Sequence, residues 1–406
     1  AVRCASVFGS GGNLDYLSHW TYSYPDPIRI RLCTDELFCM AAGSDRQDQQ
    51  VMKMTQIIWY RSQTAPEPGE EAQLARPDFM DKDTQPDNAS AETTDKYQAE
   101  WERRIPDARF ITIAPMHLRE AFWTKISRPI QGIMYHGWGS LVEEVAHGSY
   151  RYTHPDTRNE LKRLVEEIVT PLGPALMQIP DRPADVAMLE SFASEMFAGR
   201  GTYGWNSSWA GDMHLILLYA GLQPDILFEE TIQRSGLDRY KVLVMPDCDV
   251  LPESIVQAVL AFQAKGGIVV GDERLCPAIK PAIRIETHSR PKEADAARAM
   301  NQEKAAQLRT QLDPVYKRYV DCSTSDVIPR LRSYGTTDYL FAVNDKREFG
   351  DYVGHHGLVM ENGLPSNAVL SIAREGYVYD LLQSKQVDIK EDAETINIDR
   401  HFGPCD

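Results

Sequence analysis

The sequence has little positive charge. It contains 43 Lys and Arg residues against 59 Asp and Glu residues, which gives a formal net charge of -16. Binding to DNA or RNA depends on basic side chains that neutralise phosphates, so nucleic acid is not expected as a partner. Net charge bears on solubility and association rather than on fold, so the acidity alone identifies no substrate.

Long hydrophobic runs are also missing. The longest strongly apolar stretch, Met213 to Leu222, is interrupted by His214 and reaches only half of the roughly 20 residues that span a bilayer. We therefore expect no membrane partner. No basic segment followed by an apolar one opens the sequence, so no signal peptide is visible from Ala1 onward, and a cytoplasmic location is slightly favoured over export.

Cysteine and phosphate-binding motifs are sparse. Seven scattered cysteines without a CxxC pair are typical of reduced thiols rather than of a disulfide frame or a zinc finger. The glycines from Gly9 to Gly12 lack the flanking elements and the Lys of a phosphate loop. Cys248 lacks the Gly-x-Cys-x-Gly turn of a nucleophile. We expect neither a metal nor another cofactor.

The chain of 406 residues is long enough for two or three domains, because single cores stop growing at about 250 to 300 residues. Strand and helix patterns alternate in the first part, residues 1–170, which predicts a partial (β/α) barrel with a surface insertion at 63–96. The expected strands are Ile28 to Cys33, Val51 to Tyr60 and Gly132 to Trp138, and the expected helices are Glu36 to Ala42 and His117 to Ser127.

A helix from Pro155 to Val169 comes next, and the segment Pro171-Leu-Gly-Pro174 is expected to end it. Residues 175–290 then alternate again, which predicts a doubly wound α/β domain. Residues 291–320 predict a connecting helix, and the period of two in 321–406 predicts a small β-sandwich. Among the expected elements are strands Val186 to Phe192, Lys241 to Met245, Ile268 to Val270, Tyr339 to Val343, Ala368 to Ala373 and Thr395 to Ile398, and helix Glu253 to Lys265.

One strand–helix–strand unit resembles a known family. Leu237-Asp-Arg-Tyr-Lys-Val-Leu-Val-Met-Pro246 with Lys265-Gly-Gly-Ile-Val-Val-Gly271 is similar to the corresponding unit of bacterial barrel β-galactosidases. Val378 to Leu381 resembles their closing strands, and Gly132 to Ser140 resembles their last barrel strand. The resemblance implies a partial barrel, a flavodoxin-like trimerisation domain and a C-terminal β-sandwich, with an oligosaccharide or glycoside as ligand and a homo-oligomeric assembly.

The sequence departs from this family at the catalytic positions. By the resemblance, Val51 to Tyr60 is the seventh barrel strand and Ile28 to Asp35 the sixth. The family places a nucleophilic Glu at the end of the seventh strand, where this sequence has Gln56. The acid/base of the fourth strand would lie before Ala1, since a whole barrel needs about 250 residues. Either a further N-terminal segment or chain completes the barrel, or the barrel is not closed.

Glycoside hydrolysis normally needs two carboxyl groups. The best candidates are Asp35 and Glu36, where a predicted strand ends and a helix begins, because barrel active sites are built at such ends. The alternative is that these acids only cap the helix. Glu143 and Glu144, after the last predicted barrel strand, are weaker candidates for a second carboxylate.

Aromatic and polar residues are expected on the same rim as a sugar-binding surface. Residues spaced by two on a strand face the same side, so His136 and Trp138 are expected to lie together. The predicted contacts to substrate are Gln56, Trp59, Tyr60, His136 and Trp138. Filling of the barrel core is the alternative for the aromatics. The sequence therefore predicts a glycoside hydrolase, with a non-catalytic carbohydrate-binding or assembly subunit as the alternative.

Overall fold

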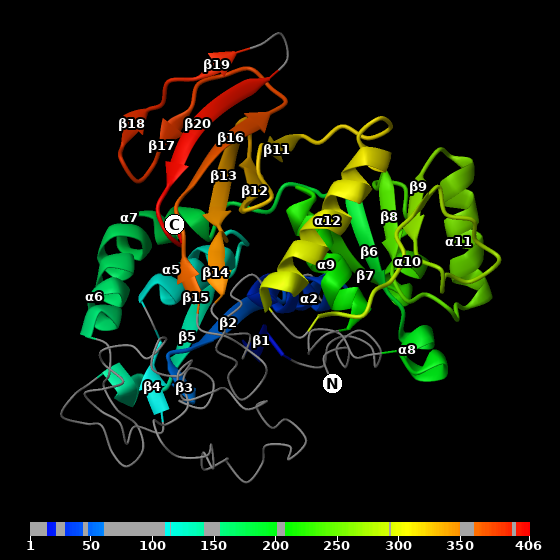
Figure 1. Ribbon diagram of the computed structural model, residues 1–406, viewed down its shortest axis with the longest axis horizontal. Coiled ribbons are helices and arrows are strands. Elements are labelled where there is room, and N and C mark those ends of the chain that lie inside the picture. Colours follow the sequence, from blue (N-terminus) through cyan, green and yellow to red (C-terminus); the bar gives the residue numbers. More distant parts are fainter. Residues whose placement is uncertain are drawn as a thin grey trace.

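The computed structural model describes a mixed α/β protein with two parallel sheets and a group of antiparallel strands near the C-terminus (Figure 1). The described residues are 14–21, 29–43, 48–60, 110–113, 115–141, 155–200, 208–291, 294–349, 361–391 and 395–406. Within these ranges, none of the helices combines the length and the hydrophobicity that a bilayer span requires.

The first sheet consists of three parallel strands, β1 (Tyr16–Thr21), β2 (Gln50–Gln56) and β5 (Gly132–His136), in the order β1-β2-β5. Helix α2 (Arg29–Gly43) connects β1 to β2, and α5 (Pro115–Ile126) precedes β5. Neighbouring strands that follow one another through helices are the arrangement of part of a (β/α) barrel.

The predicted strand Ile28 to Cys33 is wrong, because Arg29 to Cys33 belong to α2. Apolar Ile30, Cys33, Leu37 and Met40 recur at helical spacing and are all buried. The strand that precedes β2 is Tyr16–Thr21, one helix earlier than expected. Asp35 and Glu36 therefore lie inside a helix and not at the end of a strand.

A short ribbon extends the carboxyl end of β2. Strand β3 (Ile58–Tyr60) pairs antiparallel with β4 (Phe110–Thr112). The insertion expected at 63–96 falls between these two strands, outside the described residues.

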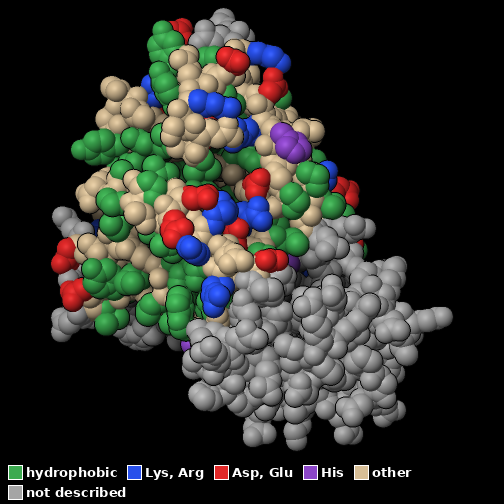
Figure 2. All heavy atoms as spheres, turned by 90° about the vertical axis from the view of Figure 1, so that its left-hand side faces the viewer, with side chains coloured by type: hydrophobic (Ala, Val, Ile, Leu, Met, Phe, Trp, Pro, Cys, Tyr) green, Lys and Arg blue, Asp and Glu red, His purple; other side chains and the backbone are tan. Residues whose placement is uncertain are grey.

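The helix after β5 runs further than its prolines suggest. Helix α6 (Pro155–Leu164) continues through a π-helical turn, η4 (Val165–Val169), into α7 (Thr170–Leu176). The expected end at Pro171 is wrong, because Pro171, which has no N–H to donate, directly follows the π-helical turn, whose last backbone bond runs from the Thr170 amide to the Val165 carbonyl oxygen. The Thr170 hydroxyl also donates to the Val165 carbonyl oxygen (2.8 Å). Acidic and basic side chains are interspersed on the face that carries this helix (Figure 2).

The second sheet has five parallel strands in the order β10-β9-β8-β6-β7. Its helices cover both faces, and two separate hydrophobic clusters lie on its two sides. If β6 to β10 are numbered 1 to 5, the order across the sheet is 2-1-3-4-5, which is common in doubly wound sheets. The expected strands of this region are confirmed. The strands are β6 (Val186–Glu190), β7 (Asp225–Phe228), β8 (Val242–Met245), β9 (Ile268–Gly271) and β10 (Ile283–Arg284), and the helices are α8 (Phe192–Ala198), α9 (Trp209–Tyr219), α10 (Glu229–Ser235) and α11 (Glu253–Ala264).

Helix α12 (Ala294–Leu312) packs against α9 through Ala305, Leu308 and Leu312 and leads into the C-terminal strands. These strands pair antiparallel around a hydrophobic cluster of their own, which confirms the expected change to period two. They are β11 (Val320–Cys322), β12 (Val327–Tyr334), β13 (Thr337–Asn344), β14 (Arg347–Phe349), β15 (Glu361–Gly363), β16 (Ser366–Ile372), β17 (Tyr379–Asp380), β18 (Lys385–Gln386), β19 (Lys390–Glu391) and β20 (Ile396–Phe402).

The two parallel sheets share one hydrophobic core. Leu37 and Met40 of α2 belong to the same buried cluster as Leu215 and Leu218 of α9. Helix α2 thus packs on the barrel-like sheet with one side and on the doubly wound unit with the other, which fixes the two sheets relative to each other.

Candidate carbohydrate-binding rim

Among the described elements, the β1-β2-β5 sheet has one face toward the helices and one open face. Val51 of β2 is buried in the same cluster as α2, so Val51, Lys53 and Thr55 face the helices by strand alternation. The other face carries Met52, which packs next to Gly132, and Met134, which is 43% exposed. In a closed barrel this open face would be the interior.

The carboxyl end of β5 turns sharply after His136. Gly137 has a φ of 84°, in the left-handed region that favours glycine. Trp138 then begins a 3-10 helix, η2 (Trp138–Leu141), whose last residue Leu141 is buried and anchors the turn in a hydrophobic cluster. Trp138 is 57% exposed. The expected placement of His136 and Trp138 on one strand is therefore wrong, because the strand ends at His136.

Backbone hydrogen bonds join this turn to the end of β2. The Ile57 amide donates to the His136 carbonyl oxygen (3.0 Å), and the Ile113 amide donates to the Ile57 carbonyl oxygen (3.1 Å). Burial lowers the pKa of the His136 imidazole below its usual value. A neutral imidazole has one N–H donor and one N acceptor, which suits it to hydroxyl groups.

Three of the predicted contact residues are placed by their backbone alone. Gln56 ends β2 directly opposite His136, as expected of two neighbouring barrel strands. Trp59 and Tyr60 lie on β3, in the ribbon beyond the rim. The side chains of Gln56, Trp59 and Tyr60 are outside the described residues, as are Glu143 and Glu144.

Asp35 lies far inside the protein and has charged partners. Its carboxylate is 3.5 Å from Nε of Arg31, 3.3 Å from Nη1 of Arg128 and 3.0 Å from Nε2 of His214. Burial opposes its ionisation, but the charges of Arg128 and Arg31 and the hydrogen bond from His214 outweigh burial and hold the Asp35 pKa well below its usual range. This is the environment of a structural ion pair.

Glu36 is only 1% exposed. Burial raises its pKa to about 8, although the nearby charge of Lys53 acts in the opposite direction. Lys53 belongs to the helix-facing side of β2, and its ammonium group donates to the His19 carbonyl oxygen (3.3 Å). Glu36 thus lies behind the sheet, between strand and helix, and not on the open face. The catalytic roles of Asp35 and Glu36 stay predictions.

Sequence reasoning missed the buried lysines beneath this sheet. Lys53 and Lys125 are at most 1% exposed, and the Lys125 ammonium hydrogen-bonds the Thr55 hydroxyl. Burial lowers the pKa of both lysines. The sequence does contain a signal for Lys53. Val51, Lys53 and Thr55 alternate along β2 with Met52 and Met54, so Lys53 lies on the same side of the strand as the buried Val51.

At the carboxyl edge of the doubly wound sheet, polar groups contact one another. The Glu229 carboxylate accepts from the Ser191 hydroxyl (2.8 Å) and from the amides of Phe192 (3.0 Å) and Ala193 (3.2 Å). The place where related sheets bind phosphate is thus filled by the protein's own carboxylate. Cys248 is fully buried and its thiol pKa is raised by burial, which agrees with the expectation that it is no nucleophile.

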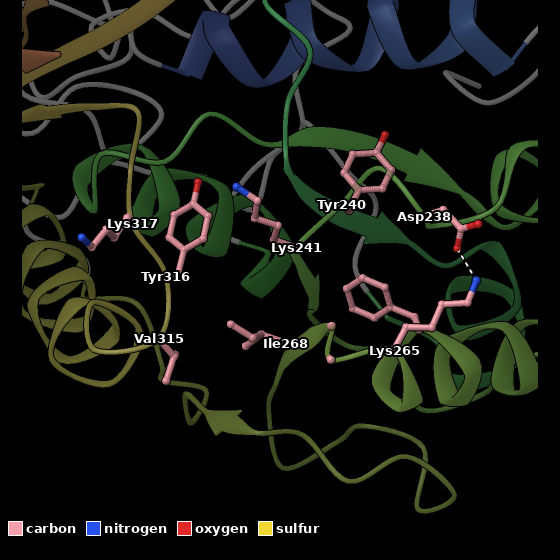
Figure 3. A pocket seen from close by; sticks show the side chains of 11 residues that line it. Asp238, Tyr240, Lys241, Lys265, Ile268, Val315, Tyr316 and Lys317 are labelled. Atoms are coloured by element: carbon pink, nitrogen blue, oxygen red, sulfur yellow. Dashed lines mark hydrogen bonds and ion pairs between the residues drawn. The ribbon is translucent and has the colours of Figure 1, made fainter. Parts of the chain in front are cut away.

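An open cleft of about 640 Å³ lies at the opposite, amino edge of the same sheet (Figure 3). It is lined by Tyr240 and Lys241 before β8, by Lys265 after α11 and by residues 315–317 after α12. Lys265 is held by Asp238, with 2.6 Å between Nζ and Oδ1. Ligands of parallel sheets bind at the carboxyl edge, so we do not assign this cleft to the function. Among the described residues, no group of three or more His, Cys, Asp or Glu side chains is arranged to hold a metal ion.

Comparisons with known proteins find similarity in structure and not in sequence. No protein-family model and no curated protein matches the chain. The GH42 β-galactosidase Gan42B superposes with a TM-score of 0.51 and 11% identity over 95% of this chain and 59% of its own. A catalytic mutant of Gan42B from G. stearothermophilus gives 0.50, with 12% identity and the same coverage. The α-L-fucosidase isoenzyme 2 from Paenibacillus thiaminolyticus gives 0.48, with 13% identity over 72% of this chain and 56% of its own.

The chain spans 56 to 59% of the length of these structures. At such low identity the likeness concerns the fold alone. In fold, the chain resembles barrel glycoside hydrolases of the β-galactosidase type, as the strand–helix–strand motif indicated.

Proposed function

We propose that this glycoside hydrolase-like protein binds carbohydrate at the carboxyl ends of β1, β2 and β5. One observation carries the proposal: Trp138 is 57% exposed immediately after the Gly137 turn that ends β5. An exposed aromatic ring on a rigid turn offers an apolar face to the C–H groups of a sugar, and the neutral His136 next to it offers a donor and an acceptor.

The geometry favours binding over hydrolysis by this chain alone. Strands β1, β2 and β5 contain no Asp or Glu at any position. Asp35 and Glu36 are buried in α2. We therefore propose a carbohydrate-binding or assembly subunit rather than a hydrolase. The proposed contact residues are Gln56, Trp59, Tyr60, His136 and Trp138.

The open face of β1-β2-β5 motivates a second part of the proposal. Apolar Met52, Met54 and Met134 on this face match the interior positions of a barrel. We propose that further strands, from another segment or chain, cover this face and that their ends contribute the carboxylates. The proposed division is a partial barrel at 1–170, a flavodoxin-like domain at 175–290, a connecting helix at 291–320 and a β-sandwich at 321–406, assembled as a homo-oligomer.

Binding is tested by titrating the protein with simple glycosides, beginning with methyl β-galactoside, and measuring the heat or the tryptophan fluorescence. Trp138→Ala should weaken binding about tenfold, which corresponds to about 1.4 kcal/mol. The matched control is Tyr377→Ala, since Tyr377 is 80% exposed but lies in the C-terminal region. Equal affinity in wild type and Trp138→Ala would remove this rim from the proposal.

Hydrolysis is tested with a panel of aryl glycosides, using the wild type, Asp35→Asn and Glu36→Gln. We expect no turnover by this chain alone. Turnover that disappears in Glu36→Gln, with the fold intact by circular dichroism, would instead support the hydrolase and name Glu36 as its carboxylate.

A further inference from the structure

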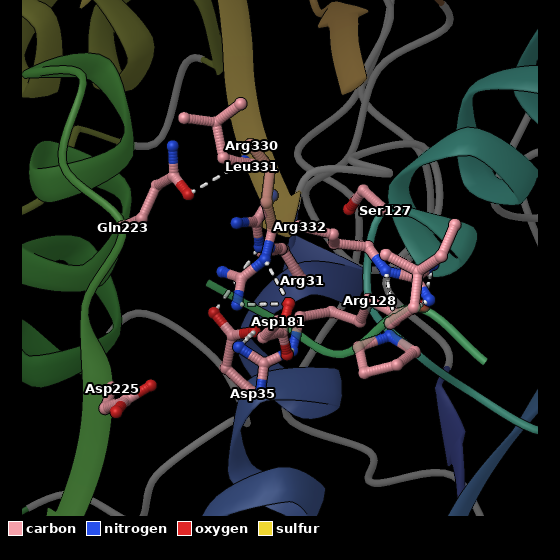
Figure 4. Close-up of polar contacts among 12 residues, drawn as sticks. Arg31, Asp35, Ser127, Arg128, Asp181, Gln223, Asp225, Arg330, Leu331 and Arg332 are labelled. Atoms are coloured by element: carbon pink, nitrogen blue, oxygen red, sulfur yellow. Dashed lines mark hydrogen bonds and ion pairs between the residues drawn. The ribbon is translucent and has the colours of Figure 1, made fainter. Parts of the chain in front are cut away.

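A junction of buried arginines joins the barrel-like sheet, the doubly wound unit and the C-terminal strands (Figure 4). Arg31 comes from α2, Arg128 follows α5, and Arg330 and Arg332 come from β12. Each of the four residues is at most 4% exposed. Charges buried to this extent need partners, because their desolvation is unfavourable.

Two carboxylates lie among these arginines. Asp35 contacts Arg31 and Arg128, as described above. Asp181 contacts Nε of Arg128 at 3.1 Å and Nη2 of Arg330 at 3.0 Å. His214, the remaining neighbour of Asp35, is neutral, because burial lowers its pKa. Asp225 is engaged elsewhere, 2.5 Å from Nη2 of Arg239.

Arg332 is balanced by backbone carbonyl groups rather than by a carboxylate. Its guanidinium donates to the carbonyl oxygens of Ile179 (3.0 Å) and Ile126 (3.1 Å) and to that of Leu176. Ile126 and Leu176 end α5 and α7, and the carboxyl end of a helix attracts a positive charge. Arg332 is therefore satisfied without an anion.

The four guanidinium groups contact only two carboxylates, Asp35 and Asp181, so positive charge is in surplus at the junction. Among the described residues, Nη2 of Arg31 and Nη1 of Arg330 have no hydrogen-bond acceptor, although both atoms are buried. Burial, followed by the charge of Arg330, lowers the pKa of Arg31 to about 9. Buried donors without acceptors are rare in native proteins.

We propose that this junction binds one small monovalent anion of the halide class, which accepts from the buried N–H groups of Arg31 and Arg330. A single negative charge would offset part of the surplus. The anion would bridge α2 and β12, so it would stabilise the contact between the barrel-like sheet and the C-terminal strands rather than take part in chemistry at the rim.

The test is a thermal-unfolding titration with sodium chloride at constant ionic strength, in which sodium gluconate replaces the missing salt. A bound anion stabilises the folded state in a saturable way. The unfolding midpoint of the wild type should therefore rise by several degrees and reach a plateau, and bromide should act like chloride. A midpoint that does not depend on the halide would overturn the proposal.

Arg31→Met removes one of the two proposed donors and one positive charge, so the halide-dependent rise should disappear. The control is Arg298→Met, because the Arg298 side chain is only 11% exposed but lies between two carboxylates, Asp326 and Asp345, where no positive charge is in surplus. The same halide-dependent rise in Arg31→Met and wild type would contradict the proposal. If Arg31→Met does not fold, bromide-soaked crystals of the wild type decide: anomalous density between Arg31 and Arg330 supports the site, and its absence refutes it.

Discussion

The two parallel sheets of this protein end differently at their carboxyl edges. In the doubly wound sheet, Glu229 accepts hydrogen bonds from a hydroxyl and two amides, and Asp272 accepts from Nε1 of Trp209 (2.7 Å) and from the Asp247 amide (2.8 Å). In the β1-β2-β5 sheet, the corresponding edge carries the exposed Trp138 and the partly buried His136.

The contrast separates stability from binding. Both edges occupy the position where parallel sheets bind ligands. An edge whose donors already have internal acceptors stabilises the fold but has little to offer to a ligand. An edge with an exposed ring and a neutral imidazole stabilises the fold less and is available for binding. We therefore expect substitutions at the first edge to change stability and substitutions at the second to change affinity.

The largest effect is expected for Glu229→Ala. The substitution removes the acceptor of the buried Ser191 hydroxyl and of the part-buried amides of Phe192 and Ala193, which should lower the free energy of unfolding by about 3 kcal/mol. Urea denaturation followed by circular dichroism measures the change. Glu253→Ala is the matched control, an exposed acid in the first turn of α11, and it should change stability by less than about 0.5 kcal/mol. Similar losses in both variants would contradict the role of Glu229 as an internal acceptor.

The sequence predicted the doubly wound region well because its strands are buried on both faces. Continuous apolar runs such as Val242–Met245, bounded by turns, have few alternative structures. The α2 segment was misassigned for the opposite reason. Its arginine at position 31 alternates with apolar residues like a strand. Only its ion pair with Asp35, one turn further along the same helix, and the nearby charge of Asp181 make a buried arginine acceptable there.

A second prediction concerns Glu36, the buried acid of α2, which should affect stability, whereas the open face should affect binding. The Glu36 pKa is raised from about 4.3 in the unfolded chain to about 8 in the fold. Between these values the folded state keeps a proton that the unfolded state loses, so stability falls as the pH rises. From pH 6 to pH 7.5, the wild type should lose about 2 kcal/mol that Glu36→Gln retains.

Urea denaturation at the two pH values measures this difference. Glu166→Gln is the control, since Glu166 lies on the surface of η4 with a side chain 63% exposed, and it should follow the wild type. A pH dependence that is the same in Glu36→Gln and the wild type would show that Glu36 is ionised in the fold. Sugar affinity should not change in Glu36→Gln, because Glu36 lies behind the sheet.

The candidate site was predictable only in part. His136 and Trp138 were named because they belong to the predicted strand Gly132 to Trp138. The bounds of this strand were correct to within two residues, since β5 ends at His136. The place of the carboxylates was not predictable, because it depended on whether residues 29–35 formed a strand or a helix. Local periodicity did not decide this, since the deciding interactions join α2 to Arg128 and His214, far away in the sequence.

The smallest effect concerns the turn that presents Trp138. Gly137 has a φ of 84°, so Gly137→Ala should lower stability by about 1 kcal/mol. It should also weaken sugar binding severalfold, because relief of the strain shifts Trp138 relative to His136. Gly139→Ala is the matched control two residues on: an added Cβ there meets nothing within 4 Å, and both stability and affinity should stay unchanged. Calorimetric titration of both variants with the same glycoside compares them directly. If Gly137→Ala lost stability but kept its full affinity, the sugar would not depend on the position of Trp138, and the binding surface would have to lie elsewhere on the open face.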